Sequence, residues 1–210
     1  MSFPFFRKKK QIQTTKSKPE IDKVDLQLSS DIEKNAETIK KALGNSDDVF
    51  IRDLDIHHKK AKLVYLYSLA DNMMIQSVLD DLLNSNYPIE ESKHFTLEKI
   101  DSTKEPKKII TNLLVGFVLL LFEGEKDPYC FIALRSDGRQ VESPTTENIV
   151  RGSHEAYVES LQTNLFLLRR GVVSPNLTIK QIPVGKESQK PAAIVYLNNI
   201  ANLELVQQIE

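Results

Sequence analysis

Two stretches of the chain, one starting at Val49 and one at Leu177, have the same pattern of hydrophobic and polar positions. Each starts with two short apolar runs that alternate with polar residues, as strands do, and continues with an apolar pattern of helical period. Aligned with three extra residues in the second hairpin, residues 64–66 match residues 195–197 (Val-Tyr-Leu in both), and Asp71 matches Asn202 as the expected helix N-cap. Duplication of a small α/β unit and convergent patterning both explain this match.

The rest of the chain supplies further elements of both kinds. Apolar periodicity predicts helices at 31–43 and 105–115 and strands at 117–122 and 129–134, whereas residues 87–103 are polar and resemble a linker. We therefore predict an α+β fold with two small subdomains built from hairpin-plus-helix units, possibly by internal duplication. The predicted division is a basic disordered tail at 1–28, a first α/β subdomain at 29–86, the linker at 87–103, and a second α/β subdomain at 104–210.

Within the segment 142–170, ESPTTENIVRGSHEAYVESLQTNLFLLRR, we predict an amphipathic helix that opens at Gly152–Ser153. Ser153 is the expected N-cap, and Gly171 can terminate the helix. An apolar stripe for packing on a core follows from the spacing of Tyr157, Leu161, Leu165 and Leu168. From the pattern alone, a solvated face that complements the helix dipole is the plain interpretation of Glu155, Glu159, Arg169 and Arg170.

Composition narrows the class of protein. The chain has 210 residues, 40% hydrophobic and 27% charged, enough for one sizeable core or two small ones. Its net charge of −1 does not favour nucleic acid. The basic residues are concentrated at the start, where seven of them stand against Glu20 and Asp22 within residues 1–23. This tail reads either as a solvated disordered segment or, through FPFFRKKK, as an attachment to an anionic lipid surface.

Candidate chemistry is sparse. The sequence contains no HExxH, CxxC, GxSxG or P-loop motif, and its histidines and acidic residues have no metal-ligand spacing. His57 and His58 fall at the tip of a predicted hairpin, where exposure is expected. Cys130 lies in an apolar strand without a flanking base, so we expect a buried structural thiol rather than a nucleophile. We predict that the chain is not an enzyme and has no catalytic residues, cofactor or metal.

One segment resembles a known family. Within 142–170 the chain is similar to the signature of the A subunits of GerA-type spore germination receptors. The matching positions are Pro144, Glu147, Val150, Arg151, Gly152, Glu155, Glu159, Asn164, Leu167, Arg169 and Arg170. The chain departs from the pattern at Ser153, where the family usually has proline, and at His154, where it usually has arginine. The second departure puts an anion-binding role for that position in doubt.

The resemblance implies a larger protein than this chain. Members of the family are inner-membrane receptor subunits of dormant spores, in which a soluble N-terminal region precedes membrane helices and acts with B and C subunits. The longest apolar run, residues 113–122, is about half of the roughly 20 residues that a spanning helix needs. We therefore expect a soluble N-terminal portion on the cytoplasmic (core) side of the spore inner membrane, attached to it through a missing C-terminal region.

Two functions remain open for such a domain. In the first, it transmits the germination signal through contacts with the B and C subunits and with other A subunits. In the second, a small germinant, an amino acid or a sugar, binds in the cleft between the two subdomains. Either function would use the polar residues of the signature as an interaction network or a ligand site, namely Glu147, Arg151, Glu155, Glu159, Asn164 and Arg169.

Overall fold

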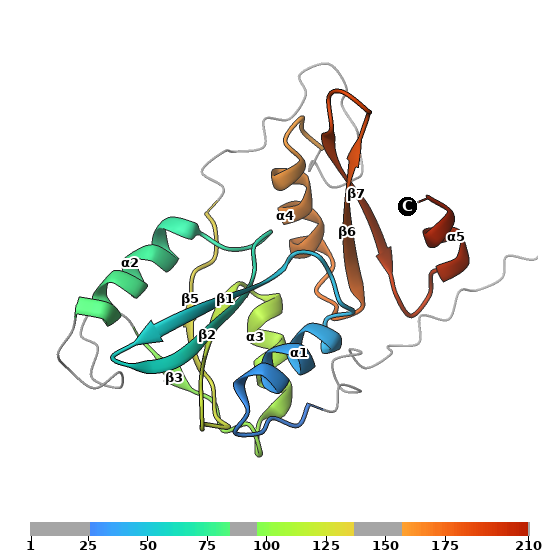
Figure 1. The fold of residues 1–210 in the computed structure, drawn as a ribbon. Coiled ribbons are helices and arrows are strands. Elements are labelled where there is room, and N and C mark those ends of the chain that lie inside the picture. Colours follow the sequence, from blue (N-terminus) through green and yellow to red (C-terminus); the bar gives the residue numbers. More distant parts are fainter. Residues whose placement is uncertain (1–25, 85–95, 137–156, 210) are drawn as a thin grey trace, which may run out of the picture.

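The computed structural model describes residues 26–84, 96–136 and 157–209, and it has a mixed α and β architecture (Figure 1). Its helices are α1 (Ile32–Ala42), α2 (Asn72–Asn84), α3 (Pro106–Leu114), α4 (Leu161–Gly171) and α5 (Leu203–Ile209). Its strands are β1 (Val49–Ile56), β2 (Lys59–Leu66), β3 (Glu98–Lys99), β4 (Phe117–Phe122), β5 (Tyr129–Ile132), β6 (Leu177–Val184) and β7 (Lys190–Leu197). The basic tail, predicted at 1–28, lies almost wholly outside the described residues.

Five strands form one antiparallel sheet in the order β1-β2-β4-β5-β3. Helices α1 and α3 pack on one face of this sheet and α2 on the other (Figure 1). Successive residues of β4 therefore enter different cores: Leu119 faces α1 and α3, whereas Val118 and Leu120 face α2. A strand that is covered on both faces needs no polar alternation, which explains the uninterrupted FVLLLF sequence of β4.

Local signals in the sequence account for the ends of these elements. Asp31 caps α1, because its carboxylate accepts hydrogen bonds from the amides of the first turn. Asp71 and Asn202 cap α2 and α5 in the same way, as the aligned patterns predicted. His57 and His58 form the exposed β1–β2 turn with φ angles of 50° and 65°. These positive φ angles are typical of a two-residue hairpin turn, whose backbone twist matches the right-handed twist of the flanking strands.

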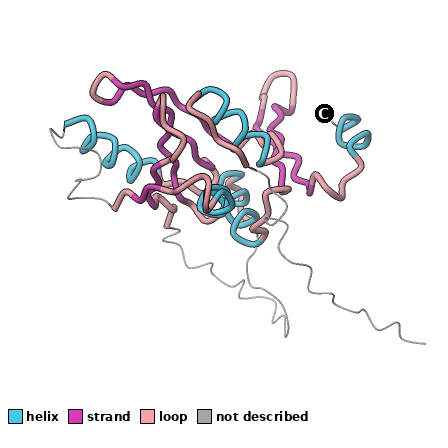
Figure 2. The backbone as a smooth tube through the Cα atoms, turned by 90° about the horizontal axis from the view of Figure 1, so that it is seen from below, coloured by secondary structure: helices cyan, strands magenta, loops and turns pink. Residues whose placement is uncertain are grey.

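Among the described residues, the second, smaller sheet has two strands, β6 and β7, with α4 beside it and α5 following it (Figures 1 and 2). Both predicted hairpin-plus-helix units are thus present, as β1-β2-α2 and β6-β7-α5. The predicted boundary at 87–103 does not coincide with the division between the sheets. The larger sheet takes strands from both sides of that range, and β3 lies inside it.

The predicted signature helix begins later than its pattern suggested. Ser153 lies outside the described residues, but residues 157–160 are described and are not helical; α4 begins at Leu161, with Ser160 as its N-cap. The Ser160 hydroxyl accepts a hydrogen bond from the amide of Thr163, so the chain turns into the helix there. Tyr157 is 70% exposed and does not join the apolar stripe. Gly171 is itself part of α4, as its last residue, and Val172 is the C-cap; Gly171 is therefore not the terminating residue beyond the helix that the pattern suggested.

Candidate functional site: a buried arginine–aspartate pair

The six candidate residues of the signature do not form one cluster in the described part of the chain. Three of them (Glu147, Arg151 and Glu155) lie outside the described residues, as does His154. Of the others, Glu159 is exposed. The Asn164 amide is used locally: its Oδ1 accepts from the Val158 amide at 2.8 Å and its Nδ2 donates to the Val158 carbonyl at 2.7 Å. Of the three candidates that the structure describes, only Arg169 joins distant parts of the chain.

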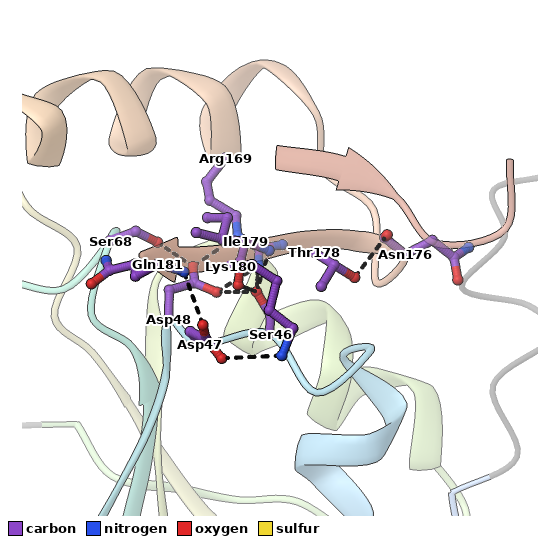
Figure 3. Close-up of polar contacts among 10 residues, drawn as sticks. All are labelled: Ser46, Asp47, Asp48, Ser68, Arg169, Asn176, Thr178, Ile179, Lys180 and Gln181. Atoms are coloured by element: carbon purple, nitrogen blue, oxygen red, sulfur yellow. Dashed lines mark hydrogen bonds and ion pairs between the residues drawn. The ribbon is translucent and has the colours of Figure 1, made fainter. Parts of the chain in front are cut away.

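Arg169 is buried, with 1% of its side chain exposed, although the pattern suggested a solvated position. It lies in the last turn of α4 and points into the junction between the two sheets (Figure 3). Its Nε donates to Oδ2 of Asp48 at 2.9 Å, and its Nη2 donates to Oδ1 of the same carboxylate at 2.7 Å. This two-point geometry is the strong form of an arginine–carboxylate pair.

Asp48 is fully buried and comes directly before β1. Besides the guanidinium, two hydroxyl groups donate to it, Ser46 Oγ to Oδ1 and Ser68 Oγ to Oδ2, each at 2.6 Å. Four hydrogen bonds therefore satisfy this carboxylate. A buried ion pair is tolerated only when its remaining polar groups are satisfied in this way. The pKa of the Tyr67 hydroxyl is raised, first because the group is buried and second because the negative charge of Asp48 lies nearby.

The same loop also holds the edge of β6. The Ser46 hydroxyl accepts from Nη2 of Arg169 at 3.0 Å and from the Ile179 amide at 2.8 Å. The amide of Asp47 donates to the Ile179 carbonyl at 2.8 Å, and the Asp47 carboxylate accepts from the Gln181 amide at 2.9 Å (Figure 3). Residues 46–47 thus cover the β6 edge as a short neighbouring strand would.

Gly44 permits this close approach. Its φ of +67° lies in the left-handed region, and a Cβ at this position would stand 2.6 Å from Oγ1 of Thr178, which is itself buried. Glycine both ends α1 and lets the following loop reach β6. The site is therefore a joint: α4 and β6 on one side, the loop between α1 and β1 on the other, with a neutralised ion pair between them.

Arg169 was a predicted network residue, but its partners were missed. Ser46 and Asp48 lie in the short polar segment 45–48, whereas Ser68 lies between Tyr67 and Leu69, and a single sequence gives no sign that the three residues meet Arg169. Hydrogen bonds fix the positions of α4, β6 and the loop between α1 and β1 relative to one another. Among the described residues, no group of three or more His, Cys, Asp or Glu side chains could hold a metal ion. Cys130 is buried and free, and burial raises the pKa of its thiol, as expected for a structural cysteine.

No helix within the described ranges is both long and apolar enough to cross a membrane. Comparison with known proteins shows relatives along most of the chain. It is 25% identical over 194 residues to spore germination protein KA of Bacillus subtilis (strain 168), covering 87% of this chain and 36% of the relative. It is 29% identical over 193 residues to spore germination protein B1 of the same organism, covering 88% of this chain and 40% of the relative. The chain thus spans well under half the length of these curated relatives.

A solved structure has a similar fold. It is the N-terminal domain of the A subunit of the Bacillus megaterium spore germinant receptor GerK3, which superposes with a TM-score of 0.65 at 22% sequence identity. The superposition covers 87% of this chain and 71% of the other. Residues 37–210 match the family described as Bacillus/Clostridium GerA spore germination protein. This match extends over most of the chain and agrees with the resemblance of the 142–170 segment, so the chain belongs to the GerA spore germination protein family.

Proposed function

We propose that this chain is the N-terminal domain of a germinant receptor A subunit and that it transmits the germination signal through the joint at Arg169 and Asp48. The observation that carries the proposal is the buried pair itself. It connects α4 to the loop before β1 across 121 residues of sequence. The same loop binds β6 through Ser46 and Asp47. A displacement of α4 and β6 therefore reaches the larger sheet through a few defined bonds.

A joint of this kind suits switching because its polar groups favour discrete states. The Asp48 carboxylate has four donors when the joint is closed, and each is lost or must find a new partner when the joint opens. Partly satisfied buried charges are costly, so intermediate arrangements are disfavoured. Signal transmission requires such an element, whose equilibrium two distant sites can bias.

The proposal extends to the surroundings of the domain. As in the family that the sequence resembles, we propose that the partners are the B and C subunits and other A subunits. The proposed place is the spore inner membrane, with this domain on the cytoplasmic (core) side. The folds of the solved GerK3 domain and of this chain are alike, which supports the assignment to an A subunit.

Germination of spores that carry a conservative variant of the joint tests this role. Arg169→Lys keeps the positive charge but loses the two-point contact with Asp48. We expect at least a tenfold slower germination at saturating germinant, with an unchanged germinant concentration at half-maximal response. Arg170→Lys, on the same helix turn but exposed, is the matched control and should germinate normally. Equal receptor abundance is verified by immunoblot. A normal maximal rate for Arg169→Lys would refute transmission through the joint.

Germinant binding is the second candidate, and one observation favours it. Nη1 of Arg169 is buried and has no hydrogen-bond partner among the described residues. A buried donor without a partner is costly and can mark a place for a polar ligand group. Titration of the isolated chain with single amino acids and sugars, followed by amide NMR shifts, separates the two functions. Saturable shifts around Ser46, Asp48 and Arg169 would favour binding, whereas a flat response would favour transmission.

A further inference from the structure

The Ser46 hydroxyl uses its whole hydrogen-bonding capacity inside the joint. A serine hydroxyl has one proton to donate and two lone pairs that accept. Its proton is donated to Oδ1 of Asp48 at 2.6 Å. Its lone pairs accept from Nη2 of Arg169 at 3.0 Å and from the Ile179 amide at 2.8 Å (Figure 3). Because Ser46 is fully buried, solvent does not replace a partner that this hydroxyl loses.

This hydroxyl occupies a special place between the ion pair and β6. Among the described residues, no other side chain hydrogen-bonds both to the Arg169–Asp48 pair and to β6. Asp47 holds β6 through its amide and its carboxylate but, in the described part of the chain, makes no hydrogen bond to the pair. Ser68 has the opposite contact: its hydroxyl donates to Oδ2 of Asp48 at 2.6 Å, on the side of the pair alone.

A second acceptor lies within reach of the Ser46 proton. The Ile179 carbonyl is 3.4 Å from Ser46 Oγ, and it already accepts from the Asp47 amide at 2.8 Å. The Asp48 carboxylate is nearer and charged, and hydrogen bonds to a charged acceptor are stronger than those to a neutral one. The ion pair therefore directs the Ser46 proton to Asp48 and leaves a lone pair for the Ile179 amide. If the carboxylate moves away, the proton can turn to the Ile179 carbonyl, and the amide then loses its acceptor.

We propose that Ser46 is the positioning residue that couples the Arg169–Asp48 pair to β6, whereas Asp47 attaches β6 without taking part in this coupling. A displacement of the pair reaches the Ile179 amide through one hydroxyl group. A displacement of β6 reaches the pair by the same route, because coupling between two sites is reciprocal. The inference rests on the proposed transmission role and names the side chain through which it acts.

Hydrogen exchange in the purified chain tests the coupling at the amide of Gln181, which bonds to the Asp47 carboxylate and not to Ser46. We expect Arg169→Lys to lower the protection of this amide at least tenfold in the otherwise unchanged chain. In a Ser46→Ala background the same change should lower it less than twofold. Ser46→Cys, whose thiol is only a weak donor and acceptor, repeats the test with a side chain of similar shape. The amides of α3 and β4 report that each variant is folded.

Ser68→Ala is the matched control, because it also removes a hydroxyl that donates to Asp48 at 2.6 Å. In its background Arg169→Lys should still lower the protection at Gln181 at least tenfold. A loss that persists in both Ser46 variants would overturn the proposal, because the backbone of residues 46–48 would then carry the coupling. A loss that Ser68→Ala also abolishes would overturn it, because any weakening of the bonds to Asp48 would then suffice.

An unchanged Gln181 amide in the Arg169→Lys chain itself would likewise exclude coupling between the pair and β6. The exchange result and the germination result are independent of each other. Normal germination of Arg169→Lys spores would refute transmission through the joint while a Ser46-dependent loss of protection still stood. Slow germination of those spores, with a loss of protection that does not depend on Ser46, would refute the role of Ser46 alone.

Discussion

Replacing Arg169 by methionine should strongly destabilise the junction between the two sheets. The variant removes three charge-assisted hydrogen bonds, two to Asp48 and one to Ser46, and leaves a fully buried carboxylate with only two hydroxyl donors. Removing one partner of a buried ion pair typically costs about 3–5 kcal/mol. For a chain of this size each kcal/mol lowers the unfolding midpoint by roughly 2–4 °C, so we expect a loss of roughly 6–20 °C.

Urea unfolding followed by circular dichroism measures this free energy, and hydrogen exchange locates the loss. The amides of Asp47 and Gln181 bond across the junction, so their protection should fall more than that of α3 or β4. Arg170→Met is the matched control. Arg170 is exposed, with its guanidinium 5.5 Å from the ring centre of Phe166, and the change should cost about 1 kcal/mol or less.

A double-mutant cycle separates the pair from its surroundings. Asp48→Asn alone should also be costly, because the guanidinium of Arg169 is then buried without a counter-charge. The double variant Asp48→Asn/Arg169→Met should lose clearly less than the sum of the two single variants, since neither uncompensated charge remains. Additive losses, or a loss below about 1 kcal/mol for Arg169→Met, would refute the view that this pair holds the junction.

Two further predictions concern the backbone and the pH dependence. Gly44→Ala should destabilise by about 1 kcal/mol more than Gly124→Ala in urea unfolding, because both glycines have positive φ but only Gly44 would clash with Thr178. Equal losses would contradict that contact. The pKa of the Asp101 carboxyl is lowered to about 2, first by its hydrogen bond with the Lys104 ammonium and then by its hydrogen bond with the Lys104 backbone amide. The stability from Asp101 is therefore present above about pH 4 and lost toward pH 2. The difference from Asp101→Asn should shrink over that range, and a constant difference would contradict it.

Most elements of the fold could be predicted because their signals are local. The strand at 117–122 and the helices near 31–43 and 105–115 have the predicted positions within one or two residues. Apolar period, end-capping residues and glycines determine such elements within a few residues of sequence. The larger sheet was not predicted, because its central contact joins β2 to β4 across more than fifty residues. Nothing in either strand alone specifies its neighbour.

The signature helix shows a limit of periodicity. Tyr157 continues the apolar spacing of Leu161 and Leu165, yet it is exposed and lies before the helix. Two polar side chains, Ser160 and Asn164, compete with this apolar spacing in setting where the helix begins. Ser160 caps the helix and Asn164 closes a loop onto Val158, and together they hold the preceding residues out of the helix. The hydrogen bonds of Ser160 and Asn164 to the backbone therefore outweigh the apolar contact that Tyr157 would make as part of the helix.

The two hairpin-plus-helix units explain why the candidate site was only partly predictable. Their shared pattern specifies two strands, a capped helix and a first buried helical residue, Ile75 in one and Val206 in the other. It contains no information on what each unit packs against. The first unit is enclosed by β4 and by helices on both faces, whereas the second meets the rest of the chain through Ser46, Asp47 and the Arg169–Asp48 pair, beside the buried Phe166 of α4. These neighbours are set by contacts between residues far apart in the sequence, so the repeated pattern predicts each unit but not the joint between them.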